Sequence, residues 1–426
     1  MTLVLNIFCA IIVLMNVFIG VIVGVFMLML LVVAHELGHF IMARRNGVEV
    51  EEFGIGFPPR AIAWRKVNGK WKRIPKKDWE KVKGNGLVIS LNWLPIGGFC
   101  QMKGESAADA RKGTFGHARF LRKTKILFGG VVMNWIVAAI ILSCLAFVGM
   151  PHFIENQFMI ESDTEVVATE PVRIEEVIAG SPAALAGLRE GDIVGRARAF
   201  ECEGGCDQEE KEGIEITTTK SLLDFLAEHK GENVYFVLDR NGDYVTSEVA
   251  LADGEEYTLG AQISGSELYV SGWSAPIVGI ATTAQLTGET FKGVGQLLVN
   301  LFSGAFEIFN PNAEIKEDGA EKLAEARDSV SGPVGIVGMI FPAFAESGGR
   351  NLFFLVAVIS ISLACMNVLP IPALDGGRWL LILIYKLRNK KLTKETEEKI
   401  VSRSFMVLLG LAAVVTVIDI VRIIMR

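Results

Sequence analysis

The sequence predicts a polytopic α-helical membrane protein with about four transmembrane helices and an inserted α+β domain outside the membrane. Two observations support this fold class: several long apolar runs lack charge, and the polar remainder divides into a basic and an acidic part. The chain has 426 residues, of which 51% are hydrophobic and 21% charged. This composition excludes a disordered chain, and a net charge of −6 excludes a basic nucleic-acid-binding protein.

The first apolar run covers residues 1–43 and contains one charged residue, Glu36. About 20 apolar residues cross a bilayer, and a helix of the whole run would be roughly 65 Å long. Its only weak points are Asn16, Gly20 and Gly24. We expect one transmembrane helix within 1–45, ending near Arg44 and preceded by an apolar extension. A cleaved signal peptide is not expected, because the run has no basic start and no small-residue cleavage site.

Three further spans are expected at 126–149, 351–386 and 404–424. The third must be broken, because 367–377 reads Asn-Val-Leu-Pro-Ile-Pro-Ala-Leu-Asp-Gly-Gly, with two prolines and two glycines. Irregular backbone at membrane depth is tolerated where it is buried in protein or lines a cavity.

The charges indicate an orientation. Residues 44–125 contain 19 Lys and Arg against 7 Asp and Glu, whereas 150–351 contain 13 against 35. The positive-inside rule places 46–125 and 386–403 in the cytoplasm and the acidic segment outside.

Residues 166–262 read as a small β-rich domain. The stretch 180–193, Gly-Ser-Pro-Ala-Ala-Leu-Ala-Gly-Leu-Arg-Glu-Gly-Asp-Ile, predicts a short helix and a tight turn into a strand. A helix at 221–230 and a strand at 234–238 with an Asn-Gly turn follow. This order resembles a PDZ domain, and the alternative is an unrelated α+β domain. PDZ domains bind peptide ends by strand addition.

Two cysteines, Cys202 and Cys206, interrupt this domain. They are compatible with a disulfide in an oxidising compartment and equally with two free thiols in a surface loop. Residues 263–350 are expected to form an amphipathic and linker region, with an amphipathic helix over 274–310 and an acidic linker over 311–331.

The strongest chemical signal is His35-Glu36-Leu37-Gly38-His39. On a helix, the two histidines share one face and can reach one Zn²⁺, with Glu36 placed to take a proton from water. Three polar or ionisable groups in an apolar run are expensive without a purpose. The alternative is a polar helix-packing cluster without metal.

The third ligand is expected to be a carboxylate. Asp375 is the acidic residue of the third apolar region, and it would complete a His₂Asp set with an open position for water. The alternative role of Asp375 is the N-cap of a helix over 376–386.

These two motifs together resemble the site-2 protease family of intramembrane zinc metalloproteases, and the inserted domain resembles that of the RseP-like bacterial branch. The resemblance implies that His35, His39 and Asp375 bind zinc and that Glu36 is the catalytic base. It implies further that Asn367 engages substrate or helps to stabilise the transition state.

Two other segments support the resemblance. Residues 95–102, with Gly97, Gly98 and Phe99, look like the family's membrane-associated β-loop, which would hold an unwound substrate helix extended. The alternative is an ordinary surface hairpin. Residues 129–134, Gly-Gly-Val-Val-Met-Asn, are similar to a family motif in the second span, but valine replaces its proline.

By the resemblance, the substrate is a transmembrane protein in the lipid bilayer, such as an anti-sigma factor or a signal-peptide remnant. An upstream protease is a further candidate partner, and whether a first cleavage is required stays open. The location would be the bacterial inner membrane, with the active site toward the cytoplasm and the PDZ domain outside as a size filter or docking site. The chain departs from the RseP pattern in having a single PDZ domain, a longer apolar N-terminus and Arg378-Trp379 after the glycines. The rival interpretations are a metal-binding transporter without hydrolysis and a catalytically silent PDZ scaffold.

Overall fold

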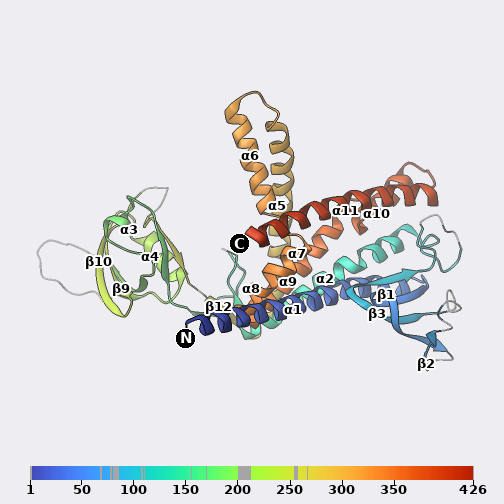
Figure 1. Ribbon diagram of the computed structural model, residues 1–426, viewed down its shortest axis with the longest axis horizontal. Helices are drawn as coiled ribbons and strands as arrows, with labels where there is room; N and C mark the ends of the chain where they lie inside the picture. The colour runs from blue at the N-terminus through green and yellow to red at the C-terminus, as the bar shows by residue number, and fades with distance from the viewer. Residues whose placement is uncertain are drawn as a thin grey trace, which may run out of the picture. The chain divides into compact units, whose positions relative to one another are not determined.

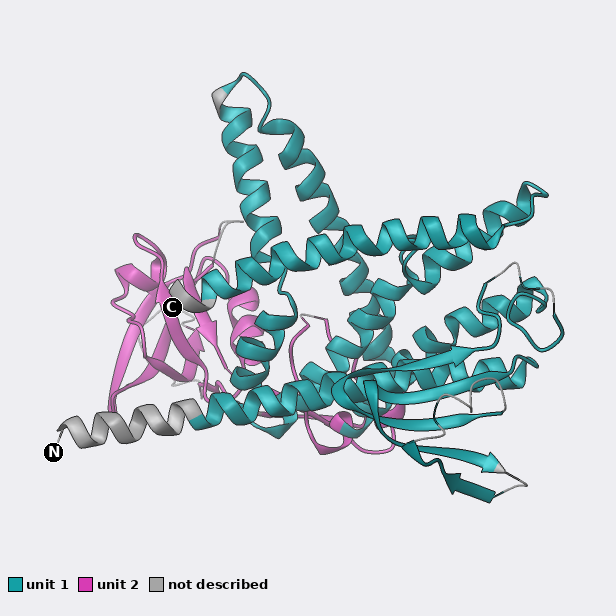
Figure 2. Cartoon of the chain, turned by 45° about the vertical axis from the view of Figure 1, so that its right-hand side comes forward, with its two compact units in different colours: residues 1–144, 279–426 teal, residues 145–278 magenta. Residues whose placement is uncertain are grey.

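The computed structural model describes residues 2–67, 70–76, 79, 86–106, 109, 111–154, 156–168, 170–199, 213–253, 258–265 and 267–425. The chain forms two compact units (Figure 2). Unit 1 contains residues 1–144 and 279–426, and unit 2 contains residues 145–278.

Unit 1 is mainly helical (Figure 1). Its longer helices are α1 (Thr2–Arg45), α2 (Phe120–Val148), α5 (Ala275–Glu307), α6 (Ala313–Asp328), α9 (Gly349–Val368), α10 (Asp375–Leu387) and α11 (Lys394–Met425). Between α6 and α9 lie α7 (Pro333–Gly335), the π-helix η2 (Ile336–Ile340) and α8 (Phe341–Glu346). A three-stranded antiparallel sheet has the order β2 (Lys70–Arg73), β1 (Val50–Val67), β3 (Val88–Met102).

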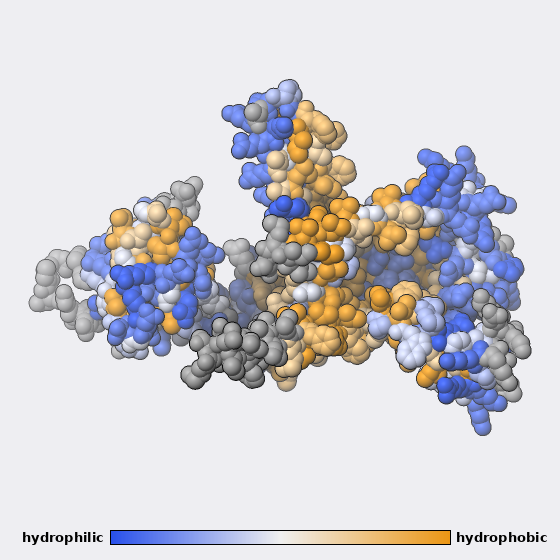
Figure 3. Space-filling view, in the orientation of Figure 1, coloured by the Kyte–Doolittle hydropathy of each residue, from blue (hydrophilic) through white to orange (hydrophobic). Residues whose placement is uncertain are grey.

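Within the described part of the chain, four helices are long and apolar enough to cross a membrane, as the sequence predicts. They cover 15–45, 120–148, 349–368 and 394–422, and the bent pair 314–328 and 333–346 brings the number to five if it forms one span. Figure 3 shows the exposed apolar side chains gathered over the helical part of unit 1. Exposed apolar side chains are stable there because hydrocarbon, not water, surrounds a spanning helix.

The long first run forms a single helix without a turn, since α1 continues through Gly20 and Gly24. Both glycines are packing contacts with α8. A Cβ on Gly20 would lie 2.5 Å from the Cα of Pro342, and one on Gly24 would lie 2.8 Å from the ring of Phe341. Small residues let helices approach closely in a membrane, where apolar burial does not drive association.

The acidic segment 311–331 was expected to be a linker, and this was wrong, because α6 occupies most of it. Asn312 caps the helix by accepting a hydrogen bond from the Glu314 N–H, as N-cap residues do. The helix packs against α5 at Gly304 and Gly319, where a Cβ on Gly304 would lie 2.8 Å from the Gly319 carbonyl oxygen.

Unit 2 is a small α+β unit. Its larger sheet has the order β10 (Asp243–Ala250), β9 (Asn233–Arg240), β7 (Ile193–Ala199), β6 (Arg173–Val177), β11 (Ala261–Ser264), with β8 (Ile214–Glu215) paired to β7. A second sheet has the order β4 (Met150–Pro151), β12 (Glu267–Ser271), β5 (Thr164–Ala168). The helices are α3 (Pro182–Leu185) and α4 (Thr219–Glu228).

The apolar face of α4 packs on the larger sheet through Leu222, Phe225 and Leu226, all of them buried. Ser181 caps α3 as its Ser-Pro start suggests, and β9 and β10 form the hairpin expected at the Asn-Gly turn. Cys202 and Cys206 lie outside the described residues, so their pairing stays untested.

Candidate metal centre

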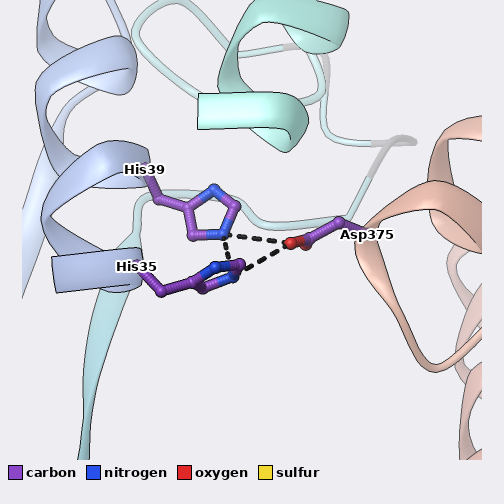
Figure 4. Close-up of side chains that lie close together, drawn as sticks. All are labelled: His35, His39 and Asp375. Atoms are coloured by element: carbon purple, nitrogen blue, oxygen red, sulfur yellow. Dashed lines mark hydrogen bonds and ion pairs between the residues drawn. The ribbon is translucent and has the colours of Figure 1, made fainter. Parts of the chain in front are cut away.

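The two histidines of α1 meet Asp375 at the start of α10 (Figure 4). His35 Nε2 and His39 Nε2 lie 3.1 Å apart, and Asp375 Oδ2 lies 3.1 Å and 3.2 Å from them. Both imidazoles are buried, and the ligating atoms all lie within 4.8 Å of one another. Ligand atoms at about 2.0–2.1 Å from one tetrahedral Zn²⁺ are themselves roughly 3.3 Å apart. The three side chains therefore fit a single zinc ion.

The α1 and α2 backbones touch beside the histidines. A Cβ on Gly38 would lie 2.1 Å from the Gly129 carbonyl oxygen, and one on Gly129 would lie 2.7 Å from the Gly38 carbonyl oxygen. A Cβ on Gly130 would lie 2.6 Å from His35 Nε2 and 2.7 Å from His39 Nε2. These three glycines let α2 form the back wall of the site.

The ring of His39 is oriented by α2. Its Nδ1 lies 2.8 Å from the carbonyl oxygen of Ile126. Because a carbonyl only accepts, the proton of this imidazole sits on Nδ1 and the lone pair on Nε2. That tautomer leaves Nε2 free to bind a metal.

Asp375 owes its place to the broken third apolar region. α9 ends at Val368 and α10 begins at Asp375. The turn between them folds back on two glycines, since a Cβ on Gly376 would lie 2.0 Å from the Val368 carbonyl oxygen and one on Gly377 would lie 2.0 Å from that of Ile371. The N-cap of α10 is Leu374, which makes no side-chain capping bond. The carboxylate of Asp375 faces the histidines.

Glu36 lies half-buried on the same turn of α1. The backbone N–H of Cys100 on β3 lies near its carboxylate. Glu36 therefore lies between the metal-ligand set and the sheet.

Gly97 and Gly98 of β3 lie against the turn of α1 that precedes His35. A Cβ on Gly97, whose φ is +93°, would lie 3.0 Å from Val32 Cγ1, and one on Gly98 would lie 3.1 Å from Val33 Cγ2. Phe99 stacks on Phe57 of β1 at 6.3 Å. The structure thus places Gly97 and Gly98 next to the helix that carries the histidines, and the ring of Phe99 against β1.

Asn367 lies in the last turn of α9. Its Nδ2 donates to the carbonyl oxygen of Leu363 in the same helix at 2.9 Å, and its side chain is half-buried. A role in substrate binding stays a prediction.

A cavity of about 880 Å³ leads to Asp375. Its charged lining residues are Glu105, Asp109, Arg111, Asp375, Arg378, Lys394, Glu397 and Glu398. Arg378 Nε donates to Glu397 Oε1 at 3.2 Å, and its Nη2 donates to the Glu105 carbonyl. Arg378, one turn after Asp375, therefore holds the start of α10 to α11 and to the segment after β3.

Sequence reasoning missed Ile126 and Gly130 and left Asn134 without a role. These residues form the wall of the site. Their spacing of four residues places them on one face of α2. The signal was the Gly-Gly-x-x-x-Asn stretch at 129–134, whose contacts depend on how two helices pack.

The chain matches the family model described as peptidase family M50 over residues 23–411. It is 28% identical to a putative zinc metalloprotease of Clostridium perfringens over 391 residues, covering 92% of this chain and 95% of the relative. It is 26% identical to the zinc metalloprotease RasP of Bacillus licheniformis, covering 92% and 96%. The chloroplastic membrane metalloprotease ARASP of Arabidopsis thaliana is 26% identical, over 91% of this chain and 76% of the relative.

Proposed function

The chain belongs to peptidase family M50, the site-2 proteases, and from that premise we propose which of its residues bind zinc and act on substrate. It is an intramembrane zinc metalloprotease, and the resemblance seen in the sequence is confirmed at the level of the family. We assign His35, His39 and Asp375 as the zinc ligands. The convergence of their three ligating atoms at 3.1–3.2 Å carries this assignment.

Bound zinc supplies a Lewis acid that polarises a peptide carbonyl and makes a water molecule acidic. Glu36 accepts the proton of the attacking water on its carboxylate and gives it to the nitrogen of the leaving amine. The Cys100 N–H lies beside this carboxylate, and His39 and Asp375 keep their orientation through Ile126 and the glycine turn. Water reaches the site through the charged cavity beside Asp375.

We propose that β3 presents the substrate. A peptide bond in a helix is shielded by its hydrogen bonds, so the substrate helix must unwind before cleavage. In the described sheet, residues 98–102 of β3 pair with β1 on one side only. Gly97 and Gly98 pass beside the turn of α1 before His35, and β3 exposes Trp93, Leu94 and Ile96. An edge strand with exposed apolar side chains can pair with an extended segment. An ordinary surface hairpin remains the alternative.

We propose that unit 2 is a PDZ domain that docks or filters substrates. A groove of about 520 Å³ runs between α4 and β11, lined by Leu223, Leu226, Ile263 and other apolar residues. Because β11 is an edge strand, a peptide can extend the sheet there and place apolar side chains in the groove.

The groove is tested with fluorescent peptides that end in an apolar residue and with the purified full chain in detergent. Leu223→Glu should weaken binding at least tenfold. Leu185→Glu is the matched control, since Leu185 is more exposed and lies outside the groove. Equal binding by both variants would remove the docking role.

We propose that 46–125 and 386–403 face the cytoplasm of a bacterium and that unit 2 lies outside, so that the site opens toward the cytoplasm. The excess of Lys and Arg in these two segments supports this orientation. The partners would be a single-span membrane protein, such as an anti-sigma factor or a signal-peptide remnant, and an upstream protease.

The assignment of the site is tested by zinc content and cleavage together. Glu36→Gln should keep zinc and lose cleavage of a single-span model substrate, because it removes the proton acceptor and leaves the ligands. Asp375→Ala should lose zinc. Equal cleavage by wild type and Glu36→Gln, or full zinc occupancy in Asp375→Ala, would contradict the assigned roles.

A further inference from the structure

Asn134 lies at the point where α1, α2 and α9 meet. Its side chain is fully buried, and its Nδ2 lies 3.5 Å from His35 Nδ1. Its backbone carbonyl accepts a hydrogen bond from Ser360 Oγ of α9 at 2.8 Å. Its Oδ1 is buried without a hydrogen-bond partner. Leaving a buried acceptor unpaired costs about 1–3 kcal/mol, so this amide requires an explanation.

The two histidines face α2 at equivalent places. Ile126, Gly130 and Asn134 are spaced four residues apart, as are His39 and His35 on α1. Ile126 touches the Nδ1 of His39, Gly130 lies against both rings, and Asn134 touches the Nδ1 of His35. One face of α2 therefore contacts the outward nitrogen of each imidazole.

If His35 binds a metal through Nε2, its Nδ1 proton requires a hydrogen-bond acceptor, and Asn134 is the residue beside it. An imidazole that binds a metal through Nε2 carries its proton on Nδ1, and such ligands almost always donate that proton to an acceptor. His39 has the Ile126 carbonyl for this purpose. Among the described residues, the side chain of Asn134 is the group hydrogen-bonded to His35 Nδ1.

The amide of Asn134 can serve as this acceptor because its two ends have nearly the same shape. In the present arrangement Nδ2 faces His35 Nδ1, while His35 Nε2 is hydrogen-bonded to Asp375. Turning the amide by half a rotation brings the unpaired Oδ1 to the ring. The carbonyl–Ser360 contact fixes the backbone during this rotation.

We propose that Asn134 is a positioning residue that accepts the Nδ1 proton of His35 and thereby keeps Nε2 directed at the metal. The inference rests on the proposed role of His35 as a zinc ligand. It gives the Asn of the 129–134 stretch a chemical function that packing alone does not require.

The test compares two substitutions that keep the branched shape and the number of heavy atoms of the Asn134 side chain, in the purified full chain, with zinc affinity measured by chelator competition. Asn134→Asp keeps an acceptor, so it should bind zinc at least as tightly as wild type. Asn134→Leu removes the acceptor and should weaken zinc binding about 10- to 100-fold, the usual effect of losing such a partner. A packing role predicts the opposite order, because a buried carboxylate is worse for packing than leucine.

Two controls keep the result decisive. Ser143→Ala removes a side-chain hydroxyl of α2 that donates to the Ala139 carbonyl within the helix, and it should leave zinc affinity unchanged. If Asn134→Asp does not fold, the zinc affinity of folded Asn134→Leu is compared with that of Ser143→Ala. Wild-type zinc affinity in Asn134→Leu, or weaker binding by Asn134→Asp than by Asn134→Leu, would overturn the proposal. His35→Ala separates it from the ligand assignment, since retained zinc there would mean that His35 is not a ligand.

Discussion

Gly130→Ala should weaken zinc binding while leaving the fold intact. The added methyl group would lie 2.6 Å from His35 Nε2 and 2.7 Å from His39 Nε2. Ordinary contact begins near 3.4 Å, so a ring must retreat by about 0.8 Å, and the ligand distances of a zinc site tolerate about 0.2 Å. The rings can swing away, so the cost should fall on metal binding.

Overpacking of this kind costs about 1–3 kcal/mol, which corresponds to roughly 5- to 150-fold weaker zinc binding at 1.4 kcal/mol per factor of ten. The zinc-free protein should not be destabilised, because alanine is a better helix former than glycine by up to about 1 kcal/mol. Zinc affinity is measured by chelator competition and stability by thermal unfolding after zinc removal.

Gly410→Ala is the matched control. Gly410 lies on α11, and a Cβ there meets nothing within 4 Å. It should bind zinc as wild type does. Zinc affinity of Gly130→Ala within twofold of that of Gly410→Ala would refute the close-approach argument.

The other predictions concern Asp375, unit 2 and the metal. Gly376→Ala should reduce both zinc content and cleavage, because its methyl would lie 2.0 Å from a carbonyl oxygen of the preceding turn and displace Asp375; normal zinc content by metal analysis would contradict this. Burial raises the pKa of Asp192, but the Arg240 guanidinium at 2.7 Å and a backbone N–H lower it by more. The net result is a pKa below the ordinary value of an aspartate. The stability from this pair is therefore present above the ordinary Asp pKa and is lost as pH falls through the lowered pKa. Acid unfolding of unit 2 should occur at higher pH in Arg240→Met than in wild type. An unchanged unfolding profile would count against the pair. Zinc removal should lower the unfolding temperature of unit 1 only, since all three assigned ligands lie there; at 100 times the dissociation constant, zinc adds about 2.7 kcal/mol, and an equal shift in unit 2 would argue against the site.

Local chemistry could be predicted from the sequence because it depends on spacing within one helix. The His35-x-x-x-His39 pair needs only the periodicity of α1, and Asp375 stood out as an acid in an apolar region. The break at residues 369–374 followed from its prolines and glycines. These features do not depend on which helices pack together.

Features that depend on packing were not predictable in this way. Gly20 and Gly24 look like weak points of a helix, yet each is a contact with α8. Asn134 looks like an ordinary polar residue until α1 is placed beside it. The error at 311–331 had a different cause, because acidic composition was given more weight than the capping signal of Asn312.

The glycines around the metal site have two roles that cannot be separated. In a bilayer, helices associate through close packing because lipid is as apolar as their side chains. Gly38, Gly129 and Gly130 supply that packing between α1 and α2, and the same close approach brings α2 to the imidazoles. A substitution that improves α2 as a helix therefore damages it as the wall of the site. Helix propensity alone would favour larger residues at these positions, whereas the packing of α1 on α2 and the approach of α2 to the imidazoles both require glycine.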